Sequence, residues 1–165
     1  MIITHLNEVF MNYFYELTHN FVLMAAVISW ASAQVIKTII DFIFTKELSL
    51  ERLVGAGGMP SCHSATVCAL STASALRYGL GSFEFAISTI FAIVVMYDAR
   101  GVRRETGNQA EVLNQIMSFL KTQNHEDLKF TQENLKELIG HTPLQVFVGG
   151  LLGIAMAFAF YGIMH

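Results

Sequence analysis

Residues 57–66, with the sequence GGMPSCHSAT, end a short polar loop and open a long apolar segment. The adjacent glycines Gly57 and Gly58 allow backbone N–H groups to approach an anion closely. Pro60 can begin a helix there without removing a hydrogen-bond donor that the helix needs. The free N–H groups and the dipole of a first helical turn favour negative charge. The stretch therefore predicts a phosphate-binding turn at the start of an apolar helix.

Ser61 and His63 fall in the first turn of this predicted helix. A hydroxyl group there can donate to a phosphate oxygen, and a histidine can transfer a proton near neutral pH. The alternative is an ordinary capped helix whose histidine hydrogen-bonds a neighbour, because short motifs often occur by chance. Both interpretations place the start of a long helix at about residue 60.

The composition is that of a membrane protein. Of the 165 residues, 53% are hydrophobic and 14% are charged, and the mean hydropathy is +0.49, which is far more apolar than a typical soluble domain. The net charge is −3, and the basic residues do not form one continuous patch, so no nucleic-acid partner is expected. Cys62 and Cys68 have neither CxxC nor zinc-ligand spacing. We therefore expect two reduced, buried thiols, no metal and no cofactor.

Apolar runs predict an all-α integral membrane protein with about four transmembrane helices. The runs cover residues 21–44, 60–78, 83–97 and 143–164. The first run is long enough to cross a bilayer, whereas the third is short unless Asp98 and Arg100 lie at the water boundary. In the last run, small residues recur at every fourth position, at Gly149, Gly153 and Ala157. This pattern predicts close packing, either within the chain or across a homodimer.

Amphipathic segments extend from the predicted spans. Residues 1–20 have apolar side chains on one helical face and predict an interfacial helix. No Lys or Arg precedes Lys37, so we do not expect a secretory signal. Residues 98–140 form a polar helical insertion with two apolar stripes, one over residues 113–120 and one over residues 128–139.

Basic residues lie mainly in the first and third loops between the predicted spans. Eight of the ten Lys and Arg residues fall there, and only Arg77 lies near the second turn. The positive-inside rule places these two loops in the cytoplasm and both termini outside. Residues 1–165 are therefore expected to form a single multi-pass domain of a cell membrane, with a bacterial plasma membrane as the first expectation. Lys37 and Asp41 are four residues apart near the end of the first span, where they are expected to neutralise each other, to reach the interface or to face a polar site.

A second motif lies at the end of the third apolar run. Residues 97–110 read YDARGVRRETGNQA and include Arg100, Arg103 and Arg104. Guanidinium groups bind phosphate through paired hydrogen bonds, so this cluster predicts a phosphate site at the membrane boundary. The alternative is a topology signal or contact with lipid headgroups.

The motifs GGMPSCHSA, YDARGVRRETGNQAEVLN and GHTPLQVFVGG together resemble the divergent branch of the type 2 phosphatidic acid phosphatase family, which is remotely related to vanadium haloperoxidases. The resemblance covers most of the chain from Gln34 onward. In the broader family, one basic motif binds phosphate and a Pro-Ser-Gly-His motif supplies an acid histidine. A third motif supplies an arginine and a nucleophilic histidine that an aspartate orients.

The resemblance assigns only some of these roles to residues of this chain. The Pro-Ser-Cys-His run at residues 60–63 matches the second motif, with cysteine in place of glycine. Either Lys37 or Lys46 stands for the lysine of the first motif, without the Arg-Pro pair that follows it in the family. Arg103 matches the arginine of the third motif, but Gln109 occupies the position of the nucleophilic histidine. Because a glutamine amide cannot form a phosphoenzyme, the family mechanism does not transfer intact.

The leading hypothesis is hydrolysis of a phosphomonoester or diphosphate on a membrane lipid whose phosphate headgroup lies at the cytoplasmic leaflet. The expected catalytic residues are His63, which protonates the leaving oxygen or acts as nucleophile, Asp98, which orients it, and His141, a reserve base or nucleophile. The expected phosphate-binding residues are Lys37, Gly57, Gly58, Ser61, Arg103 and Arg104. The alternatives are a protein that binds or transports a phosphorylated lipid without catalysis, and a structural membrane subunit.

Overall fold

Helices make up nearly all of the computed structural model, which describes residues 2–46, 58–122 and 142–164. The described residues form six helices and no strand, in the order α1 (Ile2–Thr18), α2 (Phe21–Thr45), α4 (Cys62–Tyr78), α5 (Phe83–Arg100), α6 (Val102–Thr122) and α7 (Pro143–Met164). This confirms the all-α fold class that the apolar runs predict.

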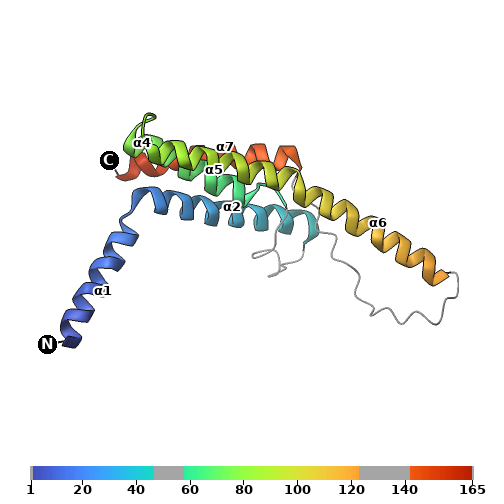
Figure 1. Cartoon of the computed structure of the whole chain (residues 1–165), viewed down its shortest axis with the longest axis horizontal. Helices are drawn as coiled ribbons and strands as arrows, with labels where there is room; N and C mark the ends of the chain where they lie inside the picture. The colour runs from blue at the N-terminus through green and yellow to red at the C-terminus, as the bar shows by residue number, and fades with distance from the viewer. Residues whose placement is uncertain (1, 47–57, 123–141, 165) are drawn as a thin grey trace.

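Four of these helices form a bundle. α2, α4, α5 and α7 lie side by side (Figure 1), and α4 packs against each of the other three. α1 leaves the bundle at the end where α2 begins, and α6 continues from α5 beyond the opposite end. The two sequence motifs, at the start of α4 and at the start of α6, therefore lie at the same end of the bundle.

Small side chains line the face of α2 that packs on α4. Ser29 and Ala33 are both fully buried. Ala33 packs against Cys62 and Ala65, and the Ser29 hydroxyl donates to the Ala65 carbonyl oxygen over 3.1 Å. The middle of α2 is thereby fixed beside the first turn of α4.

Glycines on α7 bring its backbone against that of α4. Gly149 packs against Ser61, and Gly153 packs against Ala65. A Cβ atom added at Gly153 would lie 2.9 Å from the Ala65 carbonyl carbon and closer still to its oxygen. Ala157 continues the same buried face. The repeat of small residues is therefore used within the chain, and the predicted homodimer stays a prediction that would need another surface.

Two helices of the described residues, α2 and α7, are long and apolar enough to cross a membrane. α4 and α5 have 17 and 18 residues and pack beside them. Hydroxyl groups on α4 are satisfied within the bundle: Thr66 Oγ1 donates to the Cys62 carbonyl oxygen over 2.7 Å, and Ser71 Oγ lies 2.8 Å from Thr89 Oγ1 on α5. The four bundle helices thus correspond to the four predicted spans. Two of them, α2 and α7, are by themselves long and apolar enough to cross a membrane.

Two helix boundaries differ from those that the sequence predicts. α4 begins at Cys62 rather than at Pro60, because Ser61 is its N-cap. α5 continues to Arg100, so Asp98 belongs to this bundle helix and not to the polar helical insertion predicted over residues 98–140. In the polar insertion, the first predicted stripe lies on α6, whereas the second falls outside the described residues.

Candidate functional site

Ser61 builds the start of α4. Its backbone is extended (φ −68°, ψ 115°), and its side-chain oxygen accepts a hydrogen bond from Ser64 N over 3.4 Å. The Ser64 hydroxyl donates to the same oxygen over 3.1 Å, and both serines are fully buried. Ser61, predicted to donate a hydrogen bond to phosphate, therefore serves in this structure as the N-cap of α4.

The start of α7 holds this turn in place. The Ser61 N–H donates to the Gln145 carbonyl oxygen over 3.1 Å. Thr142 and Gln145 form a capping box, because Thr142 N donates to Gln145 Oε1 (3.0 Å) and Gln145 N donates to Thr142 Oγ1 (3.4 Å). The GHTPLQVFVGG motif thus has a physical role. It starts α7, whose backbone supports the turn at Ser61.

Lys37 is buried against the turn that precedes α4. Only 4% of the residue is exposed, and a Cβ atom added at Gly58 would lie 2.9 Å from Lys37 Cδ and 3.0 Å from its Cγ. Gly58 has a φ of +83°, a conformation that favours glycine. Lys46, the other lysine considered for the first motif, is the exposed C-cap of α2. Lys37 is therefore the lysine that lies beside the turn leading into the Pro-Ser-Cys-His run at residues 60–63.

His63 and Asp98 lie at the same end of the bundle. His63 is half-buried in the first turn of α4, with its Nδ1 atom 3.8 Å from Cys62 Sγ. α5 runs antiparallel to α4, and Cys68 Sγ lies 3.7 Å from Met96 Sδ. Asp98, two residues beyond Met96, is therefore level with the first turns of α4, and it is also half-buried.

Four of the predicted site residues cannot be compared with the structure through their side chains. Arg103 and Arg104 lie in the first turn of α6, where the structure describes the backbone but not these side chains. Gly57 and His141 lie outside the described residues. The convergence of both arginines on one polar pocket stays a prediction. The predicted residues that the structure brings to one end of the bundle are Lys37, Gly58, Ser61, His63 and Asp98.

Gln109, at the position of the family's nucleophilic histidine, is exposed on α6. Together with Glu105, Asn108, Val112 and Leu113, it lines a shallow groove formed by that helix alone. α6 extends past the end of the bundle (Figure 1). The position therefore supplies neither an imidazole nor a buried environment for a phosphoenzyme. Within the described ranges, no group of three His, Cys, Asp or Glu residues could hold a metal ion.

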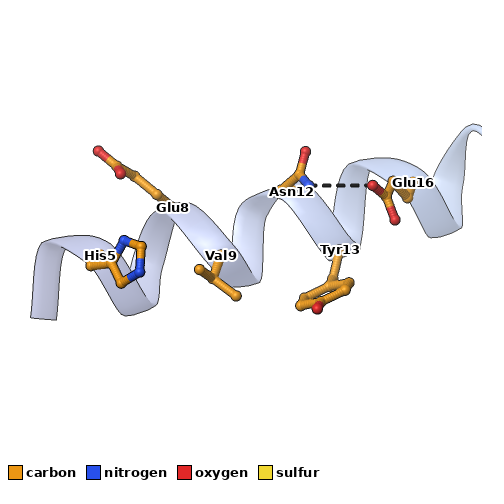
Figure 2. A pocket seen from close by; sticks show the side chains of 6 residues that line it. All are labelled: His5, Glu8, Val9, Asn12, Tyr13 and Glu16. Carbon is orange, nitrogen blue, oxygen red and sulfur yellow. Dashed lines mark hydrogen bonds between the residues drawn. The ribbon is translucent and has the colours of Figure 1, made fainter. Parts of the chain in front are cut away.

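A second groove runs along α1 and is also formed by one helix. Figure 2 shows its lining residues, which are His5, Glu8, Val9, Asn12, Tyr13 and Glu16. Asn12 Nδ2 donates to Glu16 Oε1 over 3.3 Å. Because α1 leaves the bundle at the end opposite the start of α4 (Figure 1), this groove lies away from the candidate site. The helix predicted over residues 1–20 is confirmed, and its interfacial position stays a prediction.

Gln34 is a buried polar residue to which the sequence reasoning gave no role. It is 7% exposed, and its Oε1 atom has no hydrogen-bond partner in the part of the chain that the structure describes. It lies three residues before Lys37 and therefore on the same side of α2. The sequence contained a signal for it, because Gln34 interrupts the apolar run that starts at Phe21.

If this end of the bundle binds phosphate, as the sequence predicts, replacing Gly58 with alanine should weaken phosphate binding as well as stability. The positive φ costs an alanine roughly 1 kcal/mol, and the new Cβ atom would displace Lys37 Cδ from its position 2.9 Å away. Gly79→Ala is the matched control, because Gly79 has a φ of +87° but nothing lies within 4 Å of its added Cβ. Both variants should melt at a lower temperature, and only Gly58→Ala should bind a phosphorylated lipid more weakly than the parent. Equal lipid binding by the two variants would contradict a role for the Lys37 contact.

Comparison with known proteins gives two matches. The divergent PAP2 family matches residues 18–156, a range that includes all three motifs. The uncharacterized membrane protein YuiD of Bacillus subtilis (strain 168) is 45% identical over 148 residues, which cover 86% of this chain and 94% of the relative. No solved structure matches the chain.

Proposed function

The chain belongs to the divergent PAP2 family, and we propose that this PAP2-related membrane protein hydrolyses a phosphomonoester or diphosphate on a membrane lipid. The proposed site lies where α2 ends and α4 and α7 begin. The observation that carries the proposal is the burial of Lys37 against Gly58, at the turn into α4. The contact joins the Lys37 side chain to the turn that starts α4, and an ammonium group and a helix N-terminus both favour an anionic ligand.

Each proposed residue has a separate task in this site. Lys37 and the first-turn N–H groups of α4 hold the phosphate oxygens. Arg103 and Arg104, at the start of α6, add paired hydrogen bonds from guanidinium groups. His63 protonates the leaving oxygen, and Asp98 orients His63.

The nucleophile distinguishes two routes. Gln109 cannot attack phosphorus, so either His141 forms a phosphoenzyme or water attacks the phosphorus directly. On both routes the bond from phosphorus to the lipid oxygen breaks, and the proton from His63 goes to that oxygen. A phosphoenzyme that survives quenching in alkaline denaturant in the parent chain and is absent from His141→Ala would select the first route, because phosphohistidine is stable to base. Its absence from the parent chain would select direct attack by water.

We propose that α2, α4, α5 and α7 each cross the membrane, with both termini outside and the site at the cytoplasmic boundary. The length and apolarity of α2 and α7 support this topology, and α4 and α5 pack beside them. The concentration of Lys and Arg in the first and third loops sets the orientation. In bacterial cells, a compartment-sensitive reporter fused after His165 should therefore report the outside of the plasma membrane. A cytoplasmic signal would contradict the topology.

Phosphate release from lipids tests the proposed activity. The purified full-length chain is incubated with phosphatidate, lysophosphatidate, and polyprenyl phosphates and diphosphates, and inorganic phosphate is measured. His63→Ala should lower the release rate by at least about 100-fold, because it removes a general acid. His19→Ala is the control, since His19 is exposed at the far end of the bundle, and it should release phosphate at the rate of the parent. Release by His63→Ala at the parental rate would overturn the catalytic role of His63.

Lipid binding without phosphate release would select a different function. The chain would then bind or transport a phosphorylated lipid, and the glutamine at position 109 favours this alternative because it removes the family's nucleophile. If the chain neither binds the lipid nor releases phosphate, the proposal is overturned and a structural membrane subunit remains. The same purified samples therefore separate all three functions.

A further inference from the structure

The C-terminal half of α2 has a polar stripe on one face. Gln34, Lys37 and Asp41 are three and four residues apart, which places them on the same side of the helix. Gln34 and Lys37 are 7% and 4% exposed, and Asp41 is half-buried. Polar side chains inside a candidate membrane span are costly and mark functional sites. The stripe therefore extends the proposed site beyond Lys37.

Gln34 has a buried acceptor for which the described part of the chain supplies no donor. Its Oε1 atom is enclosed and has no hydrogen-bond partner there. The hydroxyl group one turn further along is satisfied, because Thr38 Oγ1 donates to the Gln34 carbonyl oxygen over 2.9 Å. An unpaired buried acceptor destabilises the folded chain. A ligand with a donor at this position would remove that cost in the bound state.

The neighbouring lysine limits what this donor can be. Gln34 and Lys37 are about one helical turn apart, so their side chains reach adjacent parts of the same ligand. If Lys37 binds the phosphate of a lipid, the lipid groups one or two carbons from that phosphate lie near Gln34. An ammonium donor that reaches Gln34 would lie closer to Lys37, three residues away on α2, than to the Asp41 carboxylate, seven residues away, and it would be repelled. A hydroxyl group is neutral and donates well to an amide oxygen.

We propose that Gln34 recognises a hydroxyl group next to the phosphate of the bound lipid. The preferred ligand is then a phosphorylated lipid of the lysophosphatidate class, with a free hydroxyl beside its phosphate, and not a lipid that is acylated at that position. This inference rests on the proposed phosphate site and adds a specificity-determining residue to it.

A pair of lipids that differ only in this hydroxyl tests the proposal. The first is 1-oleoyl lysophosphatidate, and the second is the analogue in which hydrogen replaces the glycerol hydroxyl. Both are titrated against the purified full-length chain in lipid nanodiscs. The parent chain should bind the hydroxylated lipid about tenfold more tightly, the effect expected of one hydrogen bond. Gln34→Leu should bind both lipids with the affinity that the parent has for the analogue.

Matched variants separate this inference from the phosphate site on which it rests. Thr38→Val removes a hydroxyl from α2 that already has its partner within the helix, and it should keep the tenfold preference. Lys37→Met should weaken the binding of both lipids. Suppose that Lys37→Met weakens the binding of both lipids. If the parent then binds the two lipids equally, or if Gln34→Leu still prefers the hydroxylated lipid, the role of Gln34 is overturned and the phosphate site stands. If the parent binds neither lipid, the proposed function fails as well.

The melting temperature of Gln34→Leu separates ligand recognition from a structural role, because the two roles predict changes in opposite directions. Without lipid, Gln34→Leu should melt at the same temperature as the parent or higher, because it removes an unpaired buried acceptor. A lower melting temperature would show that Gln34 has a structural partner, and would overturn the proposal. Equal weakening of both lipids by Gln34→Leu would show that the amide contacts the phosphate itself, which would also overturn it.

Discussion

Gly153→Leu should prevent the chain from accumulating as a folded membrane protein. At this position the backbone of α7 lies directly against the Ala65 carbonyl group of α4, and even a single Cβ atom would lie 2.9 Å from the carbonyl carbon. Overpacking of side chains typically costs roughly 1–3 kcal/mol. Here the clash is with backbone, which cannot rotate away as a side chain can, so we expect a larger cost. Moving α7 away would also remove the Gln145 carbonyl oxygen from Ser61 N and dismantle the candidate site.

The yield of monodisperse protein extracted from membranes, and its melting temperature, check this expectation. Gly162→Leu is the matched control, because Gly162 is on the same helix and nothing lies within 4 Å of its added Cβ. That variant should match the parent in both measurements. A Gly153→Leu chain with the yield and melting temperature of the parent would show that α4 and α7 do not pack this closely.

The spacing of Gly149, Gly153 and Ala157 was enough to predict close helix packing from the sequence, but not its partner. Small residues at every fourth position create a flat face on any helix. The partner surface consists of backbone at Ser61 and Ala65, and backbone has no sequence signature. The sequence pattern therefore does not distinguish a contact within the chain from a contact across a homodimer.

The two long apolar helices were predictable because their signal is local, whereas the start of α4 depends on distant residues. α2 and α7 exceed the length of a bilayer span with apolar side chains. Pro60 suggested a helix start by its own properties. The observed N-cap is Ser61, whose N–H group is bonded to Gln145 and whose backbone is covered by Gly149. Both residues are more than 80 positions further along the chain, so local rules could not place this boundary.

The candidate site could be predicted as a set of residue types but only in part as an arrangement. The sequence left both Lys37 and Lys46 as counterparts of the lysine in the family's first motif, because the burial of each depends on which residues pack against α2. The structure favours Lys37 through its contact with Gly58. Gln34 was missed because an amide within an apolar run has no fixed meaning until its partners are known. The approach of Arg103 to His63 stays a prediction.

Lys37→Met should remove most phosphate-dependent lipid binding while leaving the fold intact. Methionine is unbranched and can keep the carbon contact with Gly58, but it lacks the ammonium group. Hydrogen bonds that involve a charged group contribute roughly 1.5–3 kcal/mol, so the affinity should fall by about 10-fold to 100-fold. Binding of phosphorylated lipid to the purified variant, and its melting temperature, check the two parts of this expectation.

Lys46→Met is the control that separates a specific phosphate contact from general positive charge. Lys46 is exposed at the C-terminal end of α2, and it contributes to the same cytoplasmic charge that orients the chain. If lipid phosphate responds only to the positive charge at this end of the bundle, the two variants should lose affinity equally. A loss confined to Lys37→Met, with reporter orientation unchanged in both variants, requires a buried ammonium group at the turn into α4. Equal affinities in the parent chain and in Lys37→Met would remove the observation on which the proposed phosphate site depends.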